Sequence, residues 1–159
     1  MSETYSLGPQ NGKLMIHTTR QGVAAKVGHD LDIEVEQWQA TLTTSDPPTF
    51  ELTADSTSLK ILAGHRGVKP LSDKDRTEIR KNIDQKILKQ QPIRYKDGEL
   101  EMVGNSRPCE VKLEVGADGQ FSGSATVVQS KWGIKPYTGL MGALKVADPV
   151  EIHISGRLS

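Results

Sequence analysis

An unbroken alternation of apolar and polar residues runs through residues 23–35 and predicts one long β-strand. The odd-numbered positions are apolar apart from His29, and the even-numbered positions are small or charged. Successive side chains of a strand point to opposite faces, so one face of this strand should be buried. The predicted strand, Gly22–Glu36, is longer than ordinary strands, and we expect it to bend at Gly28. A long, bent strand is typical of a barrel or a strongly curved sheet.

Shorter alternating segments follow along the rest of the chain and predict further strands. They are separated by turn residues, and the turn at residues 117–120 joins two of them into a hairpin. The predicted strands cover residues 13–19, 38–42, 50–54, 93–95, 99–103, 109–115, 121–127 and 150–154, and residues 58–62 continue the strand 50–54 after a kink at Asp55 and Ser56. Short strands at this spacing favour a sandwich or a closed antiparallel barrel.

One helix interrupts the strands at about residues 72–90. Ser72 and Asp75 form a capping-box pattern at its start. Ile79, Ile83 and Ile87 recur every fourth residue and give a charged helix one narrow apolar stripe, which is more often used for packing than for binding. The fold we predict is therefore mainly β, an eight-stranded antiparallel barrel with one inserted helix, as a single domain over residues 1–159.

Composition narrows the classes of function. Lysine and arginine together equal aspartate and glutamate, so the net charge is zero, and nothing indicates a nucleic-acid partner. No apolar stretch reaches membrane-spanning length, and the first residues lack a secretory signal pattern, so we expect a cytoplasmic protein. Aromatic residues make up only 4% of the chain. That scarcity suits a shell around a hollow, although a small core with a polar surface explains it as well.

Five segments, in their order along the chain, resemble the YceI-like family of lipocalin-like, polyisoprenoid-binding proteins. The resemblance implies a lipocalin-like barrel whose apolar tunnel holds a long isoprenoid chain, such as a quinone tail. No separate cofactor is implied. The segments are Ala25–Ile33, Asp55–Leu59, the charged helix through Ile83, Ile87 and Leu88 with Pro92–Tyr95 after it, Arg107–Val111 and Ser130–Ile134.

Our first hypothesis is therefore a protein that sequesters or carries a long isoprenoid lipid in its interior. Apolar side chains that face inward would supply the affinity. Trp132 lies in a glycine-rich segment with Tyr137, where it either plugs one end or forms a rim that closes over the lipid. The candidate ligand-binding residues are Val27, His29, Leu31, Ile33, Leu52, Met102, Val111, Leu113, Phe121, Val127, Trp132, Ile152 and Ile154.

His29 leaves two interpretations open, because it sits on an otherwise apolar face. It is either a core histidine hydrogen-bonded within the protein or a polar contact to a ligand headgroup. An enzyme that uses His29 as an acid or base is the last of our hypotheses, because the neighbouring aspartates point the other way. We predict no catalytic residues.

The remaining reactive residues point to no further site. The spacing of His17, His29, His65 and His153 matches no zinc pattern, so we expect no metal. Cys109, the single cysteine, cannot form an internal disulfide, and its position in a strand predicts a buried side chain. A ligand-free protein that forms a homodimer through a sheet edge or the helix is our second hypothesis.

Overall fold

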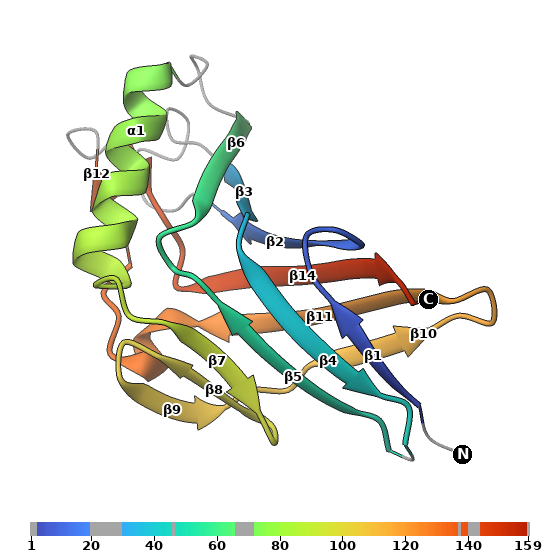
Figure 1. Ribbon diagram of the computed structural model, residues 1–159. Coiled ribbons are helices and arrows are strands. Elements are labelled where there is room, and N and C mark those ends of the chain that lie inside the picture. The colour runs from blue at the N-terminus through green and yellow to red at the C-terminus, as the bar shows by residue number, and fades with distance from the viewer. Residues whose placement is uncertain are drawn as a thin grey trace.

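The computed structural model describes residues 3–19, 30–45, 47–65, 72–136, 138–139 and 144–158. These residues form two six-stranded antiparallel sheets, one helix that continues into a wider turn, and a small two-stranded sheet. The helix α1 stands at one end of the molecule, beside β6 (Figure 1). Inward side chains of both sheets and of the helix share one apolar core.

The first sheet has the strand order β1-β4-β5-β7-β8-β9. The alternation predicted from the sequence is confirmed in β4, where Trp38, Ala40 and Leu42 are buried and the residues between them are exposed. One face of this sheet therefore belongs to the core. The strands are Thr4–Leu7 (β1), Trp38–Thr43 (β4), Thr49–Ala54 (β5), Ile93–Lys96 (β7), Glu99–Met102 (β8) and Asn105–Pro108 (β9).

The second sheet has the order β10-β11-β14-β2-β3-β6. The predicted hairpin is confirmed, since β10 and β11 pair with Val115 opposite Phe121. In β14, Val150 and Ile154 are buried while His153 is exposed, as the alternation predicts. The strands are Lys112–Val115 (β10), Gln120–Val128 (β11), Pro149–Arg157 (β14), Gly12–Thr18 (β2), Asp30–Val35 (β3) and Leu59–His65 (β6).

Only the second half of the predicted long strand falls within the described residues, as β3. Leu31, Ile33 and Val35 are buried there, which confirms the apolar face for this half. The first half, with Val27, His29 and the expected bend at Gly28, lies outside the described residues. Opposite β3, the pairing with β6 shifts register between Asp32 and Ile33, a bulge that bends the ribbon.

The predicted eight-stranded closed barrel is wrong for the described part of the chain. Twelve strands form two separate sheets, and no pairing in this part closes them into one barrel. Two of the additional strands, β1 and β9, lie at sheet edges and are only four residues long; β1 contains one buried residue and β9 none. Edge strands need little burial, so they leave only a weak trace in the hydrophobic pattern.

The two sheets are nevertheless joined at one corner, where the chain changes sheet twice. Residues 36–37 lead from β3 to β4, and residues 55–58 lead from β5 to β6. The backbone N–H of Glu36 donates to the carbonyl of Ser58 at 2.9 Å, and that of Asp55 donates to the carbonyl of Gln37 at 2.9 Å. The corner therefore holds the sheets together by hydrogen bonds as well as by packing.

The helix confirms the element predicted at about residues 72–90. Helix α1 covers Asp73–Asn82, and a π-helical turn, η1, continues it over Ile83–Ile87. The capping box is present, because the Ser72 hydroxyl accepts from the Asp75 N–H and the Asp75 carboxylate accepts from the Ser72 N–H. The other elements are the 3-10 helix Gln129–Trp132 (η2) and the short strands Thr138–Gly139 (β12) and Leu144–Lys145 (β13).

Candidate functional site: an apolar cavity between the sheets

A cavity of about 180 Å³ lies between the two sheets, and the helix covers part of it. Its described lining contains no charged side chain. The second sheet contributes Leu14, Ile16, Thr18, Leu31, Ile33, Val35, Leu59, Gly123, Ser124, Ala125, Val127, Val150, Ile152 and Ile154. The first sheet contributes Phe50, Leu52, Ala54, Ile93, Tyr95, Leu100 and Met102, the helical segment Ile79, Ile83, Ile87 and Leu88, and the connections Cys109, Val111, Gln129, Ile134 and Val146.

Most of the candidate ligand-binding residues that the structure describes lie on the wall of this cavity. They come from both sheets. Strand alternation gives the buried face of each strand, but it does not show that the two sheets face each other. The lining includes Leu31, Ile33, Leu52, Met102, Val111, Val127, Ile152 and Ile154. Whether these side chains bind a ligand stays a prediction.

Three other candidates do not line the cavity. Trp132 is buried, and its indole N–H donates to the carbonyl of Leu100 at 2.7 Å, so the ring packs against β8. Phe121 is buried behind the cavity wall, with its ring centroid 5.9 Å from that of Phe50. Leu113 is half-buried beside Gly123. The remaining candidates, Val27 and His29, lie outside the described residues, as does Tyr137.

The sequence interpretation assigned the helix stripe to packing, and the structure confirms this, since Ile79 belongs to the apolar core and Ile83 and Ile87 pack against it. The same stripe also lies on the cavity wall. Ile79 is fully buried, and Ile83 and Ile87 lie beside it at the same cavity. Side chains four residues apart stack on one helix face, so the spacing itself contained this signal. In β2, Leu14 and Ile16 also line the cavity. The sequence interpretation did not name them as candidates, although their even-numbered alternation marks them as inward.

The few polar groups in the lining are largely committed to the protein itself. The Thr18 hydroxyl accepts from the Leu31 N–H at 3.2 Å. The Gln129 side-chain amide donates to the carbonyls of Ala147 and Asp148, both at 3.2 Å. The Tyr95 hydroxyl donates to the carbonyl of Cys109 at 3.1 Å. These three side chains satisfy backbone groups of the protein, Thr18 as an acceptor and Tyr95 and Gln129 as donors.

Burial suppresses the chemistry of the two titratable groups in the lining. Desolvation raises the pKa of the Cys109 thiol above its ordinary value, so the nucleophilic thiolate is disfavoured. Desolvation is also the largest cause that raises the pKa of the Tyr95 phenol, followed by the charges of Cys109 and Glu110. Cys109 is buried, as the sequence predicted. The lining of the cavity is therefore a largely apolar surface without a reactive side chain.

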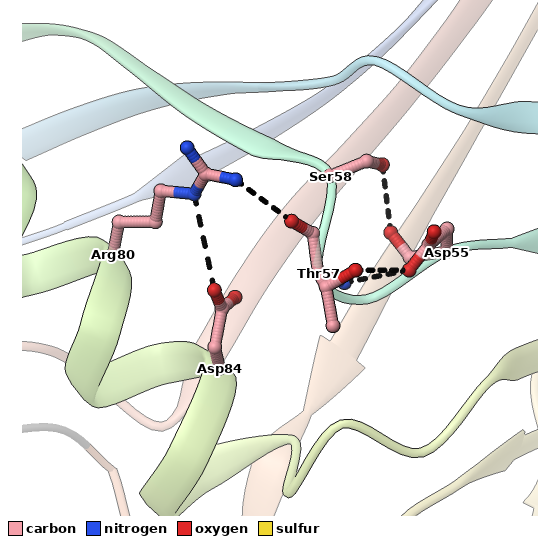
Figure 2. Close-up of polar contacts among 5 residues, drawn as sticks. All are labelled: Asp55, Thr57, Ser58, Arg80 and Asp84. Atoms are coloured by element: carbon pink, nitrogen blue, oxygen red, sulfur yellow. Dashed lines mark hydrogen bonds and ion pairs between the residues drawn. The ribbon is translucent and has the colours of Figure 1, made fainter.

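One flank of the helix meets the corner between β5 and β6, and Figure 2 shows the contacts there. The Arg80 guanidinium donates from Nη2 to the Thr57 carbonyl at 3.0 Å, and its Nε lies 3.8 Å from Asp84 Oδ2. The Asp55 carboxylate accepts from the N–H and hydroxyl of Thr57 at 2.9 and 2.6 Å, and the Ser58 hydroxyl donates to the Asp55 carbonyl at 2.7 Å. These bonds shape the turn that Arg80 reaches.

The same junction contains unsatisfied polar atoms. In the described part of the chain, the buried side-chain atoms without a hydrogen-bond partner are Ser56 Oγ, Arg76 Nε and Asp84 Oδ1. Ser56 belongs to the corner turn, and the other two belong to the helix. Desolvation raises the pKa of the Asp84 carboxyl, the Arg80 charge opposes this, and the Asp55 charge adds to it. A buried polar atom without a partner typically costs about 1–3 kcal/mol, and Ser56, which is 1% exposed, is the clearest case here.

The outer face of the second sheet carries a different group of titratable side chains. His17 Nδ1 lies 2.7 Å from Asp32 Oδ1, and the His17 ring centroid is 5.0 Å from that of His153. Among the described residues, no three or more histidine, cysteine, aspartate or glutamate side chains are grouped so that they could hold a metal ion. This cluster faces away from the cavity.

Within the ranges that the structure describes, we find no helix that is both long and apolar enough to cross a membrane.

Comparisons with known proteins agree with this architecture. The YceI-like domain family matches residues 5–158. Among solved structures, the crystal structure of Burkholderia cenocepacia BcnA is similar with a TM-score of 0.55 and 14% sequence identity, covering 91% of this chain and 94% of that chain. At this identity the likeness concerns the fold alone. No curated protein matches the sequence. Because the family match spans nearly the whole chain, this protein belongs to the YceI-like domain family.

Proposed function

We propose that the protein binds the chain of a long apolar lipid, a polyisoprenoid or an isoprenoid quinone, in the cavity between its sheets. The observation that carries this proposal is the uncharged lining of the cavity. An apolar surface of this kind gains about 0.8 kcal/mol for each methylene that it removes from water, before the cost of ordering the ligand. The resemblance to polyisoprenoid-binding proteins supports the same class of ligand.

The lining also indicates which part of the ligand would be held. The polar side chains of Thr18, Tyr95 and Gln129 that line the cavity are each hydrogen-bonded to a backbone group of the protein. Few groups remain to pair with a polar headgroup, and an unpaired headgroup would be costly to bury. We therefore propose that the chain enters the cavity and that the headgroup stays at its mouth.

Organic extraction of the purified protein, followed by mass spectrometry, tests this function. We expect an isoprenoid species at a stoichiometric amount that is absent from a mock purification. Because an expression host can lack the right lipid, the extracted protein should also be titrated with geranylgeraniol. A folded protein that neither retains nor takes up an apolar chain would contradict the proposal.

An interaction role is a second candidate, supported by one observation. Strand β10 is an edge of the second sheet, where its outer side pairs with no other described strand, and Val115 on this strand is 46% exposed. An exposed edge with an apolar side chain is a template for pairing with another chain. Sedimentation at micromolar concentration tests this interaction role. A dimer is the expected result, and a strict monomer would exclude the role.

A further inference from the structure

The size of the cavity conflicts with the length of the proposed ligand. A dry cavity of about 150 Å³ in another protein takes up benzene, so 180 Å³ holds about one isoprene unit and little more. A longer chain fits only if one wall moves outward. This inference rests on the proposed function and asks which wall that is.

The two sheets are poor candidates for such a movement. Each is a ladder of six paired strands, and backbone hydrogen bonds at residues 36–37 and 55–58 join them at the corner. Displacing a sheet would break several of these bonds together. The helical segment, by contrast, contributes apolar side chains to the wall without any strand pairing of its own.

Two parallel stripes on the helix indicate how it is held. Ile79, Ile83 and Ile87 form the stripe that lines the cavity. Arg76, Arg80 and Asp84 follow the same four-residue spacing along the neighbouring flank. Of this second stripe, Arg80 makes the hydrogen bond to the corner turn, while Arg76 Nε and Asp84 Oδ1 are buried without partners.

Among the described residues, the helix is therefore attached to the corner by its apolar stripe and by one charged hydrogen bond, which the half-exposed Arg80 side chain makes. The Thr57 carbonyl that receives this bond belongs to the turn shaped by Asp55 (Figure 2). We propose that the helix is the movable wall of the cavity, that its displacement admits longer apolar chains, and that the bond from Arg80 to Thr57 sets the cost of that displacement.

The variant Arg80→Ala tests this inference, because alanine favours the helix while removing the bond. Lys81→Ala is the matched control, since Lys81 is the exposed next residue of the same helix. Hydrogen exchange without ligand should show faster exchange of the helix amides in Arg80→Ala than in wild type, and no change in Lys81→Ala. Equal exchange in Arg80→Ala and wild type would overturn the inference.

The second readout is selectivity for chain length, measured by displacement of a fluorescent apolar probe with geraniol and with geranylgeraniol. Arg80→Ala should bind geranylgeraniol about fivefold more tightly, the factor expected of one hydrogen bond, with little change for geraniol. An equal change for both alcohols would overturn the inference and leave the proposed function intact. If neither alcohol binds to the wild type or to the variant, the proposed function and this inference both fail. The exchange data would still report whether the bond from Arg80 holds the helix in place.

Discussion

Replacing Ala54 with isoleucine should fill part of the cavity. We expect the free energy of unfolding of the ligand-free protein to rise and its affinity for an apolar ligand to fall. Ala54 is buried at the end of β5, on the cavity wall. The larger side chain adds three carbon atoms at about 0.8 kcal/mol each, so the free energy of unfolding should rise by at most about 2 kcal/mol. Strain from imperfect fit would reduce this gain.

The volume of the cavity sets the scale for this expectation. At about 24 cal/mol for each Å³, an empty cavity of 180 Å³ corresponds to about 4 kcal/mol of lost packing. Recovering about half of that amount is therefore compatible with the space available.

The same substitution should weaken ligand binding. A ligand chain would lose contacts worth about 2 kcal/mol to the isoleucine side chain, so its dissociation constant should rise roughly 30-fold.

Urea unfolding and titration with geranylgeraniol measure the two effects on the same preparations. Thr53→Ile is the matched control, because it adds an apolar side chain to the exposed face of the same strand and leaves the cavity unchanged. The reasoning is refuted if Ala54→Ile lowers stability by more than about 1 kcal/mol while binding stays at the wild-type level. That outcome would mean that the space beside Ala54 is neither accessible to a side chain nor used by a ligand.

Three further substitutions test packing and charge around the same site. Gly123→Ala should lose about 1–3 kcal/mol in urea unfolding, because a Cβ there would lie 2.8 Å from Ile154 Cγ2. Trp132→Phe should lose about 1–3 kcal/mol in the same assay, because it leaves the buried carbonyl of Leu100 without its donor. Desolvation raises the folded-state pKa of Asp84, so wild-type stability should fall as pH rises from the ordinary value of 3.8 through that raised pKa. Asp84→Asn should therefore be more stable at neutral pH and lack this fall, whereas an unchanged pH profile would contradict the assignment.

Local patterns in the sequence predicted the faces of strands well. The burial of Trp38, Ala40 and Leu42, the hairpin between β10 and β11, and the capping box at Ser72 each depend on residues close together in the chain. The corner at residues 55–58 could not be predicted in this way. The inward positions are even-numbered in β5 and odd-numbered in β6, so the phase of the alternation changes at the corner. A change of phase indicates a kink, but it does not say that the chain has moved to the other sheet.

The position of the helix stripe on the cavity wall could not be read from the sequence, for a related physical reason. A stripe of isoleucines reports that one helix face leaves water, but the same stripe results whether that face meets a filled core or a hollow. What distinguishes the two is the fit of Ile79, Ile83 and Ile87 against side chains from strands far away in the chain. The neighbouring flank through Arg76, Arg80 and Asp84 is only partly buried, because the side chains of Arg76 and Arg80 are 40% and 50% exposed. Its charges are those of a solvated helix flank, from which Arg80 reaches the corner turn. Water would satisfy these groups in a displaced helix as well, which is compatible with the movable wall proposed above.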